Sequence, residues 1–220
     1  MLPQANIALR IGINLFGTYW IETMSTNDYH FITRWRVQGT VEEIADILAD
    51  APDLARWWPS VYLDVRELAP GDARGLGKQI GLYTKGWLPY TLRWQFRISE
   101  IASNGFTLQA KGDFVGRGIW TFEQEGDWAI IMYDWKIQAD KPLLRYLSFL
   151  MKPIFTANHH WAMAQGERSL KLELARRHAS TAEELARIPA PPGPTMTSPL
   201  PLLLGFAVAL ALAYALLRRR

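Results

Sequence analysis

The chain has 220 residues, which is enough for one domain of ordinary size and an appended segment. Its 24 basic and 21 acidic residues give a net charge of +3, and the three arginines at positions 218–220 account for that excess. The rest of the chain is therefore neutral, which argues against a basic face for nucleic acid. The absence of cysteine excludes disulfides, thiolate catalysis and cysteine metal sites.

Residues 1–27 are interpreted as an extension that precedes the domain. The partly apolar stretch 7–21 is interrupted by Arg10, and no small-residue cleavage site follows it, so it makes a poor signal peptide. We expect the start site to have been assigned too early, with Met24 as the natural beginning of the soluble part.

The first regular element is a strand over residues 29–37, where apolar and polar side chains alternate. Its buried face is predicted to carry Phe31, Thr33, Trp35 and Val37. A short amphipathic helix follows, because Thr40 and Glu43 have the spacing of a capping box. This helix ends before Pro52, and a second short helix over 53–58 stops at Pro59.

The middle of the chain predicts strands with no helix between them. The predicted strands span residues 61–68, 78–83, 91–101, 106–111, 118–124 and 128–139. The last two form a hairpin across residues 125–127. Such a run of strands favours an antiparallel meander. The glycine-rich stretch 112–118 lacks the Gly-Lys-Ser/Thr ending of a phosphate loop, and we interpret it as a loop between strands.

Helix returns near the end of the chain. Pro153 suits the first turn of a helix that runs over 154–177, and the apolar stretch 143–151 predicts a shorter helix before it. Residues 178–199 carry five prolines and lack apolar periodicity after Ile188, which is typical of a linker.

Residues 200–217 carry no charge and end on the arginines at 218–220. A helix over residues 201–217 would rise roughly 26 Å, just enough to cross a hydrocarbon core of about 30 Å with snorkelling terminal arginines. The stretch has no polar stripe, so it fits an interfacial helix poorly. We expect a single-pass anchor in the lipid bilayer over 200–220, with a buried C-terminal core helix as the alternative.

The order of these elements resembles the START-like helix-grip superfamily called SRPBCC, in particular its polyketide cyclase/dehydrase and lipid-transport branch. The resemblance covers residues 29–177, roughly two thirds of the chain. It rests on residues 39–44, Trp-Trp-Pro at 57–59, residues 118–122, His-His-Trp at 159–161, and residues 166–170. It implies an α+β fold in which a curved antiparallel sheet wraps around the long C-terminal helix, here with one added transmembrane helix.

The resemblance also implies an apolar cavity between sheet and helix that holds a lipid, sterol, polyketide or similar molecule. The candidate ligand-binding residues are aromatic or small side chains on the inward faces: Trp94, Phe96, Trp120, Phe122, Trp135, Phe155, Asn158 and Ala162. Asn158 and Gln165 are polar on a buried helix stripe, so each needs a partner, either a ligand, a water or nearby backbone.

Catalytic and metal signals are weak. His159 and His160 are neighbours on a helix and point about 100° apart, so they cannot jointly hold one metal ion, and we interpret them as structural. If the domain is an enzyme of the cyclase or dehydratase type, the conceivable acids and bases are Tyr83, Tyr90, Asp113, Arg117 and Asp134. Alternation along its strand places Asp134 on the solvent side.

The leading hypothesis is a membrane-tethered, non-enzymatic carrier or sensor of an apolar small molecule, without a cofactor or a metal. The alternatives are a cyclase or dehydratase acting on a membrane-soluble intermediate, and an interaction module whose cavity is vestigial. Without a convincing signal peptide the domain is expected in the cytoplasm, although the arginines at 218–220 prefer the cytoplasmic side of a membrane and so favour the opposite orientation.

Overall fold

The computed structural model describes residues 8–13, 19–24, 28–139 and 142–196, with side chains for residues 28–138 and 152–196. Its body is a seven-stranded antiparallel sheet in the order β3-β9-β8-β7-β6-β5-β4. The strands are β3 (Asp28–Gln38), β4 (Tyr62–Ala69), β5 (Gln79–Lys85), β6 (Thr91–Ala102), β7 (Gly105–Gly112), β8 (Phe114–Glu125) and β9 (Trp128–Ala139). The predicted meander is therefore confirmed.

The first strand of this sheet, β3, lies at its edge and pairs with the last strand, β9. In β3, Phe31, Trp35 and Val37 are buried and Thr33 is half-buried, as their alternation predicts, and β3 pairs with β9 along its whole length. Trp35 lies against the rings of Trp58 and Trp120, with centroids 5.6 and 5.5 Å away. An aromatic core thus begins directly beneath the strand.

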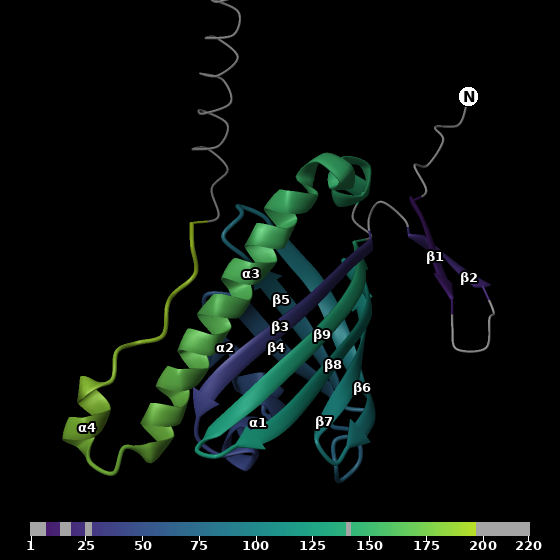
Figure 1. Cartoon of the computed structure of the whole chain (residues 1–220). Coiled ribbons are helices and arrows are strands. Elements are labelled where there is room, and N and C mark those ends of the chain that lie inside the picture. The colour runs from purple at the N-terminus through teal and green to yellow at the C-terminus, as the bar shows by residue number, and fades with distance from the viewer. Residues whose placement is uncertain (1–7, 14–18, 25–27, 140–141, 197–220) are drawn as a thin grey trace, which may run out of the picture.

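Two short helices follow β3. α1 (Val41–Ala49) has the predicted capping box, since Thr40 Oγ1 accepts from Glu43 N–H and Glu43 Oε2 accepts from Thr40 N–H. A 3₁₀ turn (Ala51–Asp53) leads to α2 (Leu54–Trp57), whose Trp57 and following Trp58 are buried. Both helices lie at the end of the sheet opposite the start of the long helix (Figure 1).

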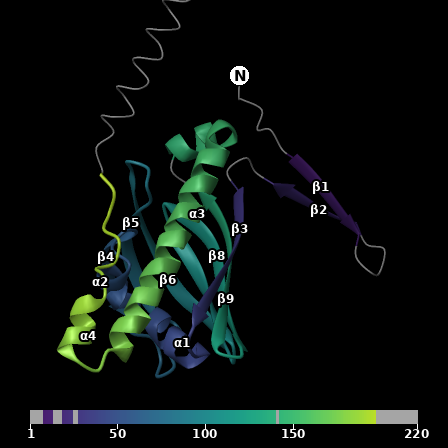
Figure 2. The same cartoon turned by 60° about the vertical axis from the view of Figure 1, so that its left-hand side comes forward.

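The long helix α3 (Pro142–His178) crosses the sheet and is gripped by it (Figures 1 and 2). Contrary to the sequence-based expectation of two helices, it is continuous through Pro153. Proline removes one backbone donor and crowds the preceding turn, which can kink a helix without ending it. Figure 1 shows the helix turning near its beginning.

The glycine-rich stretch 112–118 was predicted to be a loop between strands, and the structure differs from this prediction. Only Asp113 separates β7 from β8, so most of the stretch belongs to strands. Gly116 has φ 155°, and a Cβ there would lie 2.2 Å from the backbone oxygen of Lys136. The glycines allow close approach of neighbouring strands here and do not form a long loop.

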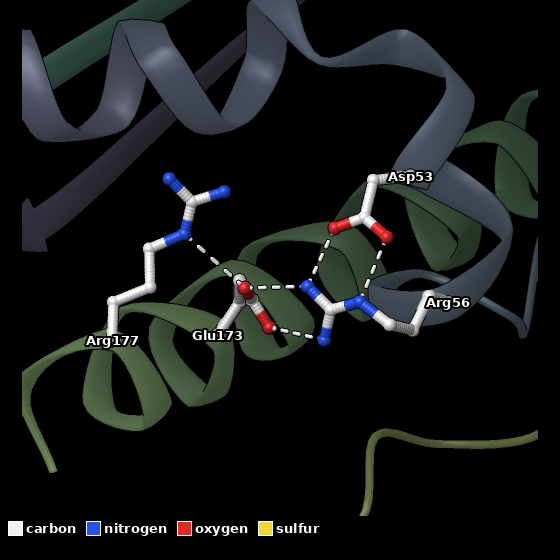
Figure 3. A network of polar contacts seen from close by, with 4 residues as sticks. All are labelled: Asp53, Arg56, Glu173 and Arg177. Carbon is white, nitrogen blue, oxygen red and sulfur yellow. Dashed lines mark hydrogen bonds and ion pairs between the residues drawn. The ribbon is translucent and has the colours of Figure 1, made fainter.

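An ion-pair network fastens α2 to the last turns of α3 (Figure 3). Glu173 is 3% exposed in its side chain and accepts from Arg56 at two atoms, with Nη2–Oε1 at 2.6 Å and Nη1–Oε2 at 2.9 Å. Asp53 holds the other side of Arg56, and Arg177 also donates to Glu173. Burial disfavours the charged form of Glu173, but the hydrogen bonds from both arginines outweigh it and lower the pKa of the carboxyl.

The segment after α3 does not leave the domain directly. A short helix α4 (Ala182–Arg187), capped by Thr181, lies within the predicted linker. We call residues 188–196 the strap, because they return along the domain to β5 (Figure 2). Arg176 donates to the backbone oxygen of Pro189, and Thr195 Oγ1 donates to the backbone oxygen of Gly86 at 3.1 Å.

The remaining described segment is a separate two-stranded antiparallel sheet of β1 (Ala8–Ile13) and β2 (Tyr19–Met24). Among the described residues, no helix is both apolar and long enough to cross a membrane. The predicted anchor at 200–217 lies outside those residues.

Candidate ligand-binding cavity

Two cavities lie between the sheet and the helices. The first has a volume of about 130 Å³ and lies under the beginning of α3, where β3, β5, β6 and β9 face it. Its walls include Phe31, Lys85, Trp94, Phe155 and His159. The wall is largely aromatic, which suits a dry site for an apolar group.

The second cavity has a volume of about 680 Å³ and lies toward α1 and α2. Apolar side chains of β6, β7 and β8 form much of its wall, among them Phe96, Leu108 and Trp120. Ligand pockets typically have volumes of about 300–1,000 Å³, so this cavity alone has the size for a small organic molecule.

Both cavities share one dividing wall, which we call the partition. Its members are Trp58, Tyr62, Trp94, Tyr133 and Met163, which line both spaces. Two of its rings rest on glycines: a Cβ at Gly166 would lie 2.2 Å from Trp58 Cζ2, and one at Gly118 would lie 2.7 Å from the Tyr133 hydroxyl. The two cavities are therefore neighbours across these five side chains.

All eight side chains predicted to bind a ligand line a cavity. The first cavity receives Trp94, Trp135, Phe155, Asn158 and Ala162, and the second receives Trp94, Phe96, Trp120 and Phe122. Strand alternation and helix spacing therefore identify the inward faces, and Trp94 connects the two sets. Their contact with a ligand stays a prediction.

Asn158 finds its partner in the backbone. Its Oδ1 accepts from Leu88 N–H at 3.1 Å and so ties α3 to the loop between β5 and β6. The side chain occupies the space beside Gly86, where a Cβ would lie 2.1 Å from Oδ1. Asn158 therefore closes the edge of the first cavity, and its acceptor is already engaged.

His159 is a polar residue of the cavity wall that the sequence interpretation treated as structural. Its ring stacks on Phe31 with centroids 4.0 Å apart, and its Nε2 is buried without a hydrogen-bond partner among the described residues. Burial, and secondarily the neighbouring His160, lower the pKa of His159 to about 3. The ring is thus neutral at physiological pH and offers an unused polar atom beside the cavity.

Three tyrosines, the buried Tyr133 and the half-buried Tyr62 and Tyr90, add neutral hydroxyls. Burial raises the pKa of Tyr90 to about 12, and it raises the pKa of Tyr62 and Tyr133 well above that of a free phenol. All three line the first cavity. Of these, only Tyr90 was among the sequence candidates for acid–base chemistry.

The other four catalytic candidates do not line the first cavity. The guanidinium of Arg93 stacks over Tyr83, Asp113 accepts from Arg93 N–H, and Arg117 is exposed. Asp134 pairs with His30 at 2.9 Å on the outer face, so its predicted solvent orientation is confirmed. In the described part of the chain, no group of three or more potential ligands could hold a metal ion.

Lys85 was missed entirely. It ends β5, is only 2% exposed and lines the first cavity. Its ammonium donates to the backbone oxygens of Thr195 and Met196 in the strap, at 2.5 and 3.1 Å. A lysine followed by Gly-Trp-Leu-Pro is typical of a solvent-exposed turn. No local sequence pattern predicts that the strap, 110 residues later, covers its side chain.

No protein-family model and no curated protein sequence matches the chain. Solved structures share its fold. A Thermus thermophilus protein superposes with a TM-score of 0.56 at 14% identity, covering 69% of this chain and 100% of that one. The Zhui aromatase/cyclase from a Streptomyces species gives 0.53 at 15% identity, covering 70% and 98%.

A START superfamily protein from Mycobacterium smegmatis gives a TM-score of 0.50 at 15% identity, with 64% of this chain and 98% of that one covered. These likenesses confirm the helix-grip fold predicted from the resemblance to the START-like superfamily. At such identities they show the fold alone.

Proposed function

We propose that this domain binds an apolar small molecule, such as a lipid, an isoprenoid or a polyketide-like compound, between its sheet and α3. The observation that carries the proposal is the pair of aromatic-lined cavities, about 130 and 680 Å³, that meet at the partition. Concave, largely apolar sites of this size with a few polar groups in their walls are typical of small-molecule binding, so these cavities favour an occupant.

Membrane tethering is the second part of the proposal. The uncharged run 200–217 has the length and composition of a bilayer anchor, and a lipid bilayer is where apolar ligands reside. The last described residue, Met196, is bonded to a side chain of the first cavity, which supports a cavity held near the anchor. We place the domain on the cytoplasmic side, which protease digestion of intact cells would contradict.

Two substitutions in α3, one on the face toward the first cavity and one on the exposed face, test ligand binding. Ala162 is half-buried and lines the first cavity, whereas Ala164 is exposed two residues later. Ala162→Trp should fill the cavity, and Ala164→Trp serves as the matched control. The full chain would be purified in detergent and its organic extract analysed by mass spectrometry.

We expect a copurifying apolar molecule in near-stoichiometric amount with the wild-type chain and with Ala164→Trp, and at least a tenfold loss with Ala162→Trp. Circular dichroism would verify that both variants are folded. Equal recovery from all three proteins, or no molecule from any of them, would contradict the proposal.

A second candidate is an enzyme of the cyclase or dehydratase type. The observation that favours it is His159, a neutral ring with an unpartnered Nε2 in the cavity wall near buried tyrosine hydroxyls. With its pKa lowered to about 3, the imidazole is a weak base, so it would act by hydrogen bonding to a bound substrate and positioning it. His159→Gln should then abolish turnover of a bound polyketide-like compound while leaving its binding intact, and unchanged turnover would remove this candidate.

A further inference from the structure

Lys85 presents a charge that the described structure leaves without a counter-charge. Its two partners, the backbone oxygens of Thr195 and Met196, are neutral dipoles, and no carboxylate of the described residues forms an ion pair with it or offsets the effect of burial on its pKa. An ammonium has three donors, of which the strap takes two. One donor and the full positive charge therefore remain for a further group.

Burying such a charge is costly. Lysine is almost never fully buried unless it is paired, and an isolated ion in an apolar interior carries a penalty of several kcal/mol. Burial lowers the pKa of Lys85, which is the direction expected when no anion balances it. A core that merely needed volume at this position would be served better by methionine or leucine.

Neighbouring polar groups do not balance the positive charge of Lys85. Thr84 Oγ1 accepts from Trp94 Nε1 at 3.0 Å, and Asn158 Oδ1 accepts from Leu88 N–H. His159 carries no charge, and the tyrosines of the first cavity are neutral phenols. The partner that the site lacks is an anion.

We infer that the first cavity is a head-group site for an anionic amphiphile, whose carboxylate binds Lys85 from the cavity side while the strap binds it from the other side. This inference rests on the proposed ligand-binding function and specifies its ligand class. An ammonium–carboxylate hydrogen bond is charge-assisted and stronger than a neutral one. The same contact would hold the strap closed over the occupied site.

The apolar body of such a ligand has a path into the larger space. The first cavity, about 130 Å³, suits a head group and a few carbons, whereas about 680 Å³ lies beyond the partition. Trp58, Tyr133 and Met163 separate the two. A single acyl or isoprenoid chain that displaces these side chains would extend from Lys85 toward Phe96 and Trp120.

The test compares two probes that differ only in the head group. The full chain in detergent would be incubated with equimolar oleic acid and oleyl alcohol at pH 8, and the complexes counted by native mass spectrometry. The variants are Lys85→Met, which keeps the length without the charge, Lys85→Arg, which restores a cation, and Lys136→Met, which removes an exposed lysine from β9.

We expect the wild-type chain and Lys136→Met to prefer the acid by at least tenfold. The preference should disappear in Lys85→Met and return in part in Lys85→Arg. Equal binding of acid and alcohol to the wild-type chain would overturn the anion site while the proposed apolar ligand binding stands. Binding of neither probe would count against the proposed function itself.

Hydrogen exchange gives an independent readout of the strap. Because head group and strap share one ammonium, oleic acid should slow amide exchange in residues 188–196, and oleyl alcohol should not. Lys85→Met should show fast exchange there with either probe. Faster exchange of the strap on acid binding would mean that the ligand displaces it, which contradicts the shared site.

Discussion

The two ends of α3 are held by different interactions. At its C-terminal end, which we call the clamped end, Glu173 binds Arg56 of α2 and His178 binds Glu43 of α1, while Arg177 also pairs with Glu173 within α3. At its beginning, which we call the cavity end, Phe155–Met163 contact rings and an unfilled space. The only side-chain hydrogen bond shown there from α3 to the sheet side, among described residues, is that of Asn158 with Leu88.

This difference assigns the two ends of α3 to different tasks: the clamped end stabilises the fold, and the cavity end lets a ligand enter and leave. A carboxylate 3% exposed and bound by two arginines fixes the helix against α2, so the clamped end is expected to unfold last. Among the described side chains of the cavity end, residues 152–163, no ion pair has to break for it to open. A ligand would therefore enter beneath the beginning of α3, where the strap also ends, while the other half of the fold keeps its shape.

The largest expected effect comes from breaking the clamped end. Arg56→Met leaves the buried carboxylate of Glu173 with Arg177 alone and should lower the free energy of unfolding by about 3 kcal/mol, because removing one partner strands the other charge. Urea denaturation measures this. Lys171→Met, which removes an exposed pair with Glu167, should cost no more than about 0.5 kcal/mol. A loss below 1 kcal/mol for Arg56→Met would show that the clamp is not a main support.

A substitution between the two ends should have the next largest effect. Gly166→Ala places a methyl group 2.2 Å from the ring of Trp58, so ring or helix must move, and overpacking of this kind costs about 2 kcal/mol. The displaced Trp58 should also alter the partition and weaken binding of any copurifying molecule. The denaturation midpoint and tryptophan fluorescence report the two effects, and an unchanged midpoint would contradict the close packing.

Acid should weaken the cavity end before the clamped end. The pKa of His159 is lowered from 6.5 to about 3, so the unfolded chain binds more protons than the folded one between these values, and stability falls as pH drops below 6.5. The slope approaches about 1.4 kcal/mol per pH unit. Glu173 has a lowered carboxyl pKa, so its contribution is lost only below pH 4.5.

Denaturation at pH 7.5 and pH 5.5 measures this difference, with a loss of roughly 1 kcal/mol expected for the wild-type chain. His159→Phe keeps the stacking on Phe31 without the titrating nitrogen and should reduce the pH dependence. The same pH dependence in His159→Phe would assign it to another group.

The smallest effect is expected from Lys85→Met. Although Lys85 is more buried than Arg56, its charge has no counter-ion in the described structure, so its loss should change the free energy of unfolding by less than about 0.5 kcal/mol or raise it. The contrast with Arg56→Met distinguishes a charge that supports the fold from one reserved for a ligand. A loss above 1 kcal/mol would show that the bonds to the strap stabilise the domain.

Features of the fold that depend on local spacing could be predicted from the sequence. The capping box of Thr40 and Glu43 needs only three residues, and alternation along β6 and β8 identified Trp94 and Trp120 as inward-facing. The eight candidate wall residues follow from the same periodicity. Such patterns reflect which face of an element is buried, not what it is buried against.

Features that depend on distant partners could not be predicted. Arg56 and Glu173 are 117 residues apart, and Lys85 and Thr195 are 110 apart, so no window of sequence contains both members of either pair. Tyr62 and Tyr133, unlike Tyr90, were missed for the same reason, because the cavity wall brings them together from strands far apart in the sequence. The continuity of α3 across Pro153 also could not be predicted, because a proline at this position is equally typical of the start of a helix.

The strap also determines how far the domain can move from its proposed anchor. Between the end of α4 at Arg187 and the apolar run at Leu200, 12 residues could extend to roughly 40 Å if the strap were free. With Thr195 and Met196 bound to Lys85, three residues remain before Leu200, a span of roughly 10 Å. A single lysine thus gives the tether a long and a short form, and a bound acid that favours the short form would keep the loaded domain at the bilayer surface.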